Sequence, residues 1–559
     1  MSLLYWIVIG ALCAPLFVGA LGVLLPSFGF EPAFSRYELT LDHWLALGSQ
    51  PEFWSGLWLS GSSGIIATLL SYWFASSLLV LCYHRSWFQR FQSAITPILS
   101  IPHAAITIGL LFLLSPSGWL IRFISPWLSG WDRPPNLLTT QDPYGITLIL
   151  ALVVKEMPYL LFALLAAISQ LNPNAHITTA RVLGYDRTSA WHFVVLPRLY
   201  ELIRLPIFIV LAFNLTVVDV ASIIGPNTPS TLAVTLLRWF NDPSLSMRGL
   251  ASAAAIALTM VVLGVMIGWH LAAKTLISYR HYEALRGDRK TPFRWLTTVG
   301  AIGAACTIVM TALTLLILPL WAFAKRWRFP DTFPSTWTFD NISRASRSLI
   351  ELSTQSLTLA FTSTTIALVL SLILLEKERH TDLSRSHTQR LLYIPIILPQ
   401  VTLLFGVQVS LLWLNLNGTW YSVAALHTFY SLPYVYLTLK SPYLAYDQAY
   451  LDQANRLKPL KWRNFFMIKL AMLKAPLFAT FAIGFSVSMA QYLPTLMAGE
   501  GRITTLTTEA VTRAASGDRK LVSIMALMQA IMPLCIFALA MLLPRYWTPI
   551  RLTIRKRMC

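Results

Sequence analysis

The sequence has few charged residues and few cysteines. Only 12% of its 559 residues are Asp, Glu, Lys or Arg, whereas an average soluble domain has about 25%. The spacing of its five cysteines indicates neither a disulfide framework nor a metal site, and they are Cys13, Cys82, Cys306, Cys535 and Cys559. We therefore expect no bound metal and no other cofactor.

The motifs of common enzyme classes are also missing. No phosphate-binding loop of the form G-x-x-x-x-G-K-[ST] occurs, which excludes ATP binding by a P-loop. Neither an H-E-x-x-H metal motif nor a nucleophile elbow is present. We expect no catalytic residue in this chain, and a membrane enzyme is disfavoured because no acid/base or metal constellation can be assigned.

Apolar residues, in contrast, are abundant. They make up 56% of the chain, and the mean hydropathy is +0.60, which is far too apolar for a soluble protein of this size. The net charge of +19 comes from basic residues in short loops between apolar runs, the pattern of loops retained in the cytoplasm. The composition therefore predicts an integral membrane protein in contact with the lipid bilayer, and it disfavours nucleic acid as a partner.

Twelve apolar runs are long enough to cross a bilayer as helices, which predicts an all-α fold of about twelve transmembrane helices. They fall at residues 3–26, 57–82, 94–114, 145–169, 205–224, 249–273, 296–324, 351–375, 391–414, 421–440, 473–493 and 521–543. A basic connector at 275–295 separates a first half, 1–274, from a second half, 296–559. Lys and Arg are about twice as frequent in alternate loops, which places both termini in the cytoplasm.

Short motifs repeat in the same order in both halves. Pro102 and Gly109 are matched by Pro399 and Gly406 at the same separation. Two tripeptides are also matched: Met157-Pro158-Tyr159 by Leu432-Pro433-Tyr434, and Ser230-Thr231-Leu232 by Thr504-Thr505-Leu506. Ordered matches of this kind indicate an internal repeat, and they predict two parallel six-helix units.

A polar, basic loop lies between two apolar runs of each half. The first loop spans 172–197, and the second, at 447–471, follows it by 274 residues. Their matched positions are Thr178, Ala180, Gly184, Leu196 and Pro197 in the first loop, and Asp452, Ala454, Lys458, Leu470 and Ala471 in the second. This spacing resembles the cytoplasmic "EAA" loop of ABC-importer permeases, which reads E-A-A, three residues, Gly, nine residues and I-x-L-P.

Local chemistry predicts a helix–turn–helix for the first loop. Asn172 and Asp186 can each cap a short helix, and Gly184 permits the backbone turn between them. The second loop departs from the pattern, because Lys458 stands where Gly is expected, although Pro459 can restart a helix. A residue with a Cβ adopts a positive φ only at a cost of roughly 1 kcal/mol. We therefore expect the two loops to contribute unequally.

The resemblance implies a type I ABC importer permease, and the fused twelve-span form is similar to the ferric-iron and thiamine permease branch. It implies two copies of an ATPase subunit bound at the two loops, a periplasmic solute-binding protein and a place in the bacterial inner membrane. The alternative is a twelve-helix secondary transporter driven by an ion gradient. That class would place its characteristic loop between the second and third spans of each half, whereas here the loop lies between the fourth and fifth.

Four polar residues inside apolar runs are candidates for the solute pathway, because ionisable residues are costly in a membrane. Lys155 and Glu156 are adjacent in the fourth run, so they are expected to pair with other helices. A structural ion pair explains them as well as a solute contact does. Asp219 and Gln491 occupy matched positions, and interfacial hydration explains Asp219 equally well. His103 is expected to be packed or hydrogen-bonded.

Overall fold

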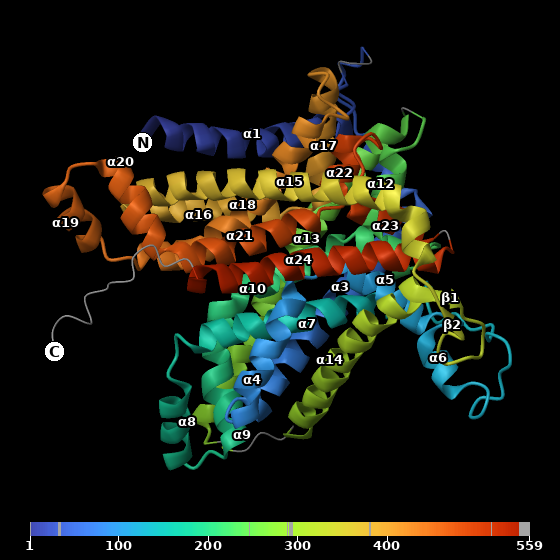
Figure 1. Cartoon of the computed structure of the whole chain (residues 1–559), viewed down its shortest axis with the longest axis horizontal. Helices are drawn as coiled ribbons and strands as arrows, with labels where there is room; N and C mark the ends of the chain where they lie inside the picture. The colour runs from blue at the N-terminus through green and yellow to red at the C-terminus, as the bar shows by residue number, and fades with distance from the viewer. Residues whose placement is uncertain are drawn as a thin grey trace.

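A computed structural model describes residues 2–31, 35–244, 246–287, 289, 294–379, 382–515 and 517–546. The described chain is almost entirely helical (Figure 1). Within these residues, eight helices are long and apolar enough to cross a membrane. Two more candidates are helix pairs bent by 96° and by 79°, which would bring the number to ten. The prediction of an all-α integral membrane protein is confirmed.

The eight straight candidates include α1, α3, α7, α13, α14, α15 and α24, together with a segment that contains α5 and α6. Their bounds are α1 (Ser2–Ser27), α3 (Pro51–Cys82), α5 (His103–Leu114), α6 (Trp119–Ile124), α7 (Ile146–Ile168), α13 (Ser246–Leu285), α14 (Arg294–Phe323), α15 (Asp340–Glu378) and α24 (Arg519–Tyr546). The bent pairs contain α16 (Asp382–Ile397) with α17 (Gln400–Trp413), and η4 (Phe465–Leu470) with α21 (Lys474–Met489).

The remaining elements are short or more polar. They are α2 (Asp42–Gly48), α4 (Ser86–Ile95), η2 (Thr96–Ser100), α8 (Pro173–Val182), α9 (Arg187–Ala190), η3 (Trp191–Val195), α10 (Leu196–Thr216), α11 (Asp219–Ile224), α12 (Leu232–Phe240), α18 (Trp420–Leu444), α19 (Ala449–Leu457), α20 (Lys461–Asn464), α22 (Leu493–Gly499) and α23 (Leu506–Ala514). Strands β1 (Ala324–Arg326) and β2 (Thr336–Trp337) form one small antiparallel hairpin.

Several expected spans are interrupted. The run at 94–114 breaks before Pro102, and the run at 391–414 bends before Pro399, because proline cannot donate the next backbone hydrogen bond. The run at 205–224 is divided between α10 and α11, and the run at 421–440 lies within α18. Much of the connector at 275–295 belongs to α13 and α14, and the residues at 288 and 290–293 lie outside the described ones.

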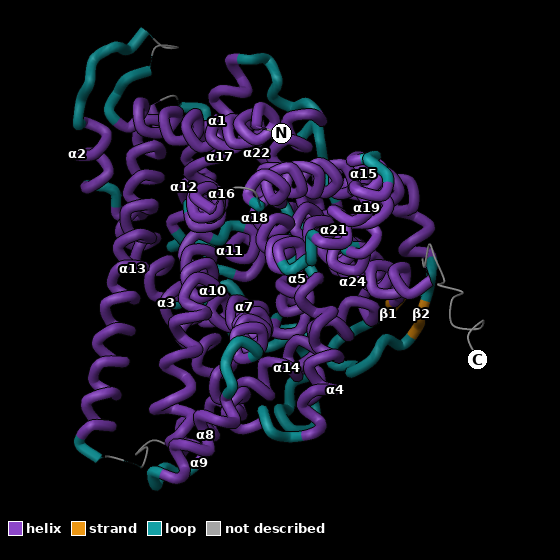
Figure 2. Tube along the Cα trace, turned by 90° about the vertical axis from the view of Figure 1, so that its left-hand side faces the viewer, coloured by secondary structure: helices purple, strands orange, loops and turns teal. Residues whose placement is uncertain are grey.

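The first helix of each half packs against the other half. In the first half α3 packs against α7 and α10, and in the second half α15 packs against α18 and α21. By contrast, α1 lies against α17, and α14 lies against α5. The two halves are therefore interlocked through an exchange of helices (Figures 1 and 2).

The matched glycines lie at these crossings. A Cβ on Gly406 would lie 2.0 Å from the carbonyl oxygen of Gly19 in α1. A Cβ on Gly109 would lie 2.4 Å from the carbonyl oxygen of Thr314 in α14. Both positions need glycine because the crossing helices meet backbone to backbone, as small residues permit in membrane proteins.

A second matched contact joins each half internally. The backbone N–H of Leu232 donates to Ser60 Oγ over 2.9 Å, and the backbone N–H of Leu506 donates to Ser356 Oγ over 2.9 Å. Each serine lies on the long helix α3 or α15, and each donor begins α12 or α23. An equivalent hydrogen bond therefore joins the start of a short helix to the long helix in both halves.

Candidate functional site

The first loop is a capped helix–turn–helix. Asn172 Oδ1 accepts the N–H of Ala175 at 3.4 Å, and Asp186 Oδ2 accepts the N–H of Thr188 at 3.1 Å. Between them Gly184 has φ +93°, a left-handed conformation that favours glycine. Both caps and the glycine turn are confirmed as local structure.

The second short helix of the first loop, α9, and the following residue Trp191 are held by packing. Thr188, Ser189 and Ala190 of α9 are buried, and Trp191 is fully buried with its ring 5.5 Å from that of Tyr83. An aromatic side chain of this size contributes a large share of the burial energy at such a contact. The loop is therefore fixed to the end of α3 by an apolar contact.

The connector between the halves and the adjoining start of α14 both contact the first loop. His192 Nε2 lies 2.9 Å from Thr297 Oγ1 of α14, and the Arg280 guanidinium lies 5.6 Å from the ring centre of Phe193. The Arg289 side chain lies beside Gly184, where a Cβ would be 2.8 Å from its Nη1. Burial lowers the pKa of His192 to about 4, so the imidazole is neutral at physiological pH.

The second loop ends its first helix differently. At the start of α19, Asp447 Oδ1 accepts the N–H of Ala449 at 2.9 Å, whereas Gln448 makes no side-chain cap. At the end of α19, Lys458 has φ −146° and ψ 107°, which is extended backbone. Lys458 therefore avoids the costly left-handed turn of Gly184, because the chain leaves the helix in an extended conformation instead. Pro459 does not restart the helix, since α20 begins at Lys461 and contains no buried residue.

An ionic contact anchors the second loop to the membrane domain. Lys469 of η4 is fully buried and forms an ion pair with Glu376 of α15, which also accepts the hydroxyl of Tyr443. The Lys469 ammonium lies 4.2 Å from the Tyr443 ring centre. By the spacing of the loops, the first-half counterpart of Lys469 is the buried Val195.

The helix tips of both loops expose apolar side chains. Leu183 is 58% exposed, and Leu457, its counterpart by the same spacing, is 89% exposed. Thr178 and Asp452 are exposed on the same helices, whereas Ala180 is buried and Ala454 is half-buried. Leu196 and Pro197 begin α10, and Leu470 ends η4. Figure 1 shows α8, α9, α19 and α20 at the left of the molecule, opposite α6 and the β hairpin.

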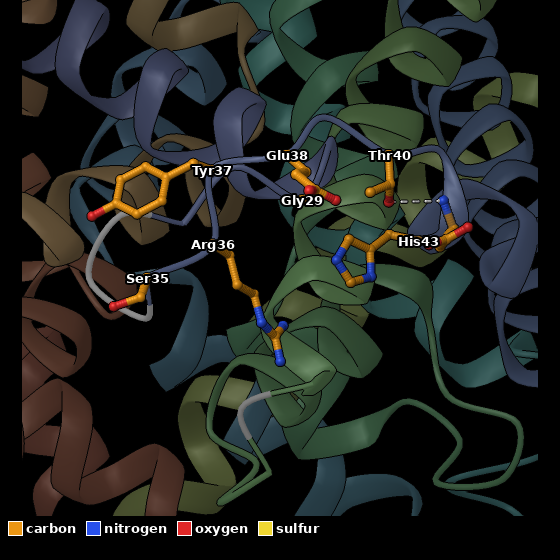
Figure 3. Close-up of a pocket in the computed structure, with 8 residues that line it drawn as sticks. Gly29, Ser35, Arg36, Tyr37, Glu38, Thr40 and His43 are labelled. Atoms are coloured by element: carbon orange, nitrogen blue, oxygen red, sulfur yellow. Dashed lines mark hydrogen bonds between the residues drawn. The ribbon is translucent and has the colours of Figure 1, made fainter.

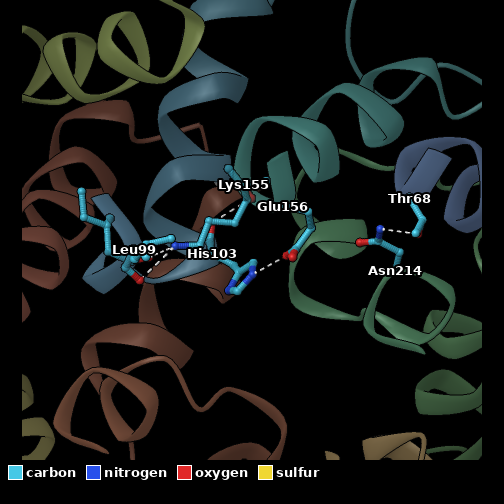
Figure 4. Close-up of polar contacts among 8 residues, drawn as sticks. Thr68, Leu99, His103, Lys155, Glu156 and Asn214 are labelled. Atoms are coloured by element: carbon cyan, nitrogen blue, oxygen red, sulfur yellow. Dashed lines mark hydrogen bonds and ion pairs between the residues drawn. The ribbon is translucent and has the colours of Figure 1, made fainter. Parts of the chain in front are cut away.

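Lys155 and Glu156 are buried and point to different partners (Figure 4). Lys155 Nζ donates to the carbonyl oxygen of Ile101 at 2.5 Å and to that of Leu99 at 3.5 Å. Those carbonyls precede the break at Pro102, so the ammonium satisfies acceptors that lack helical partners. Glu156 Oε1 lies 2.9 Å from His103 Nε2. As expected, the two adjacent side chains interact with another helix.

Asp219 and Gln491 both lie at helix breaks. Asp219 begins α11 just after α10 ends, and Gln491 lies between α21 and α22. Asp219 lies near His103, since α11 packs against α5, and it also lies near Tyr492 of the second half. Gln491 is buried. The structure thus groups Glu156 with His103 and Asp219, whereas Lys155 is occupied by backbone carbonyls.

Two surface pockets do not involve the four pathway candidates. One of about 490 Å³ follows α1 and is lined by Gly29, Ser35, Arg36, Tyr37, Glu38, Thr40, Asp42 and His43 (Figure 3). Another of about 280 Å³ lies between the halves, with Phe112 and Gln141 on one side and Arg519 and Val522 on the other. Neither pocket brings together a catalytic pair of side chains.

Sequence reasoning missed two contacts. The Lys469–Glu376 pair was not foreseen, although a lysine inside the apolar end of the loop motif was a usable signal. The expectation that His103 is packed or hydrogen-bonded is confirmed, but the sequence did not identify Glu156 as its partner. No group of three or more metal-ligating side chains occurs within the described part of the chain.

Over nearly its whole length the chain is similar in sequence to an inner membrane permease. It is 29% identical over 544 residues to the inner membrane ABC transporter permease protein YnjC of Escherichia coli (strain K12), covering 97% of this chain and 96% of that protein. No family model matches the sequence.

Proposed function

We propose that this chain is the membrane-spanning permease subunit of an ATP-driven importer and that it binds ATPase subunits through its two cytoplasmic loops. The observation that carries the proposal is the pair of loops with exposed leucines at matched tips, Leu183 and Leu457. The similarity to an ABC transporter permease supports the same class. The absence of a phosphate-binding loop in the sequence is consistent with ATP hydrolysis by a partner.

The chain provides two permease repeats, 1–274 and 296–559, joined by the connector at 275–295. Three matched features support this division: the glycine crossings, the serine-to-helix hydrogen bonds and the π-helical ends of both loops, η3 and η4. Two repeats would accommodate two ATPase subunits, one at each loop. We also propose that the chain is a fusion of two permease units and that it is related to the ferric-iron or thiamine permease branch.

The proposed mechanism is alternating access between the two repeats. Closure of the ATPase dimer would draw the two loops together, and the interlocked helices would transmit that movement to the solute pathway. A periplasmic solute-binding protein would deliver the solute on the opposite face. In this proposal the chain lies in the bacterial inner membrane with both termini in the cytoplasm.

Charge substitutions at the loop tips test the proposal. In Leu183→Asp and Leu457→Asp an exposed apolar contact becomes a carboxylate, so each variant should lose most ATPase co-purification while keeping its folded elution profile. Leu138→Asp is the matched control, because Leu138 is 75% exposed but lies far from both loops in the sequence. Native ATPase binding by both tip variants would contradict the assignment of the loops, and purified chain alone should show no ATP hydrolysis.

A further inference from the structure

A polar cluster lies where four helices meet within the first half. His103 begins α5, Glu156 lies in α7, Asn214 lies near the end of α10 and Asp219 begins α11. The Phe213 ring lies 4.6 Å from the imidazole of His103, which fixes the end of α10 against the start of α5. Broken helices that meet around polar side chains are how many transporters build solute and ion sites.

The cluster contains a buried acceptor without a partner. Asn214 is 2% exposed, and its Nδ2 donates to Thr68 Oγ1 at 3.0 Å, whereas its Oδ1 has no hydrogen-bond partner. Figure 4 shows this oxygen on the side of the amide that faces Glu156. A buried carbonyl oxygen left unpaired is costly, and a donor or a cation would satisfy it.

Charge also favours a cation. Glu156 and Asp219 supply two carboxylates, and the ammonium of Lys155 is turned to the carbonyls of Ile101 and Leu99. The imidazole of His103 adds charge only when it is protonated.

Aromatic residues from both halves lie near the cluster and are partly exposed. Tyr159 of α7 and Tyr434 of α18 lie near Glu156, and Tyr492 lies near Asp219. All three tyrosines are half-buried, and the His103 side chain is 27% exposed. Aromatic faces attract cations, so these rings and the carboxylates favour the same charge.

We propose that His103, Glu156, Asn214 and Asp219 form a site for a small cationic solute on the path between the two halves. The inference rests on the proposed function, because a permease requires such a path. It assigns charge selectivity to the first half, since the counterparts of Lys155 and Glu156 in the second half are Tyr430 and Ser431. Lys155 is excluded from the site and acts as a structural cap.

Charged thiol reagents test the site without knowledge of the solute. In a chain whose five cysteines are replaced by serine, Phe213→Cys places a thiol beside His103. We expect the trimethylammonium-ethyl methanethiosulfonate to react with this thiol at least about 10-fold faster than the sulfonato-ethyl reagent, after normalisation to an exposed Leu138→Cys control, because local potential concentrates the matching charge.

Adding Glu156→Gln and Asp219→Asn should abolish most of that preference, whereas Glu509→Gln, which removes a carboxylate paired with Arg513 outside the cluster, should leave it unchanged. Size-exclusion profiles would identify misfolded variants, and the single substitutions would then replace the double one. Equal rates, faster reaction of the anionic reagent, or no reaction with either reagent would overturn the site. Loss of ATPase binding in the loop-tip variants does not affect this readout, so the two proposals can fail separately.

Discussion

The two loops have the same outline but different anchors. The first is held by the buried Trp191, by two side-chain caps and by contacts with the connector. In the second, Asp447 Oδ1 accepts the N–H of Ala449 at the start of α19, but α20 has no side-chain cap. The ion pair between Lys469 and Glu376 joins this loop to α15. Apolar packing tolerates small changes, whereas a buried charge that loses its partner is left uncompensated. Equivalent positions of the two repeats can therefore differ in how much a substitution destabilises the loop.

Lys469→Met is expected to have the largest effect on the second loop. Removing one partner of a buried ion pair costs about 3–5 kcal/mol, so the loop should detach from α15. Limited trypsin digestion would report this as faster cleavage at the exposed Lys461 and Arg463. The double variant Lys469→Met with Glu376→Gln should recover much of the loss, and equal cleavage of native and single-variant chains would show that the pair does not anchor the loop.

Gly184→Ala should weaken the first loop more than Lys458→Ala weakens the second. The left-handed turn at Gly184 costs a residue with a Cβ about 1–2 kcal/mol, whereas Lys458 is already extended. Solute uptake and ATPase co-purification, measured at equal expression, should fall only for Gly184→Ala. Because Arg289 also crowds this position, a Gly184→Ala chain that recovers fully with Arg289→Ala would assign the loss to crowding rather than to the turn.

Asp186→Ala should destabilise the first loop by about 1 kcal/mol, the usual cost of losing a helix N-cap. Hydrogen exchange in the peptide that contains Thr188 should become faster, while Asp186→Asn, which keeps an acceptor, should stay close to native. Leu460 occupies the N-cap position of α20 in the second loop and makes no side-chain cap, so Leu460→Ala should leave exchange there unchanged. An equal response of both loops would contradict the capping difference.

Acidification should destabilise the first loop through His192. Its folded pKa of about 4 lies below the ordinary value of 6.5, so the unfolded state binds more protons between these values. Stability should therefore fall as the pH falls from about 6.5 towards 4. Thermal unfolding of native and His192→Gln chains should diverge over that range, and parallel curves would show that His192 does not titrate in this way.

Local features were predictable from the sequence because they depend on neighbouring residues. The caps at Asn172 and Asp186 and the turn at Gly184 follow from the chemistry of one or two side chains. The interruptions at Pro102 and Pro399 were not predicted, because the apolar runs continue across both prolines. The extended exit at Lys458 was missed because a loop without glycine can take another route entirely. The glycine of the loop pattern therefore predicts a left-handed turn at Gly184, but the pattern gives no conformation for the second loop, where Lys458 replaces that glycine.

Contacts between distant segments could not be predicted in the same way. His103 and Glu156 are 53 residues apart, and Lys469 and Glu376 are 93 residues apart. Their pairing depends on which helices become neighbours, and apolar runs of similar composition do not specify neighbours. Gly109 and Gly406 did mark the close crossings, but the sequence does not identify α14 and α1 as the helices that cross there.

The exchange of first helices has a consequence for synthesis of the chain. The helix α1 leaves the ribosome first, yet its neighbour α17 begins at Gln400, so most of the protein is made before the two can meet. The face of α5 around Gly109 likewise cannot form its native contact until α14 has been synthesised. Neither half can complete its native packing alone, and a single polypeptide supplies both halves in equal number and close together as they insert into the membrane.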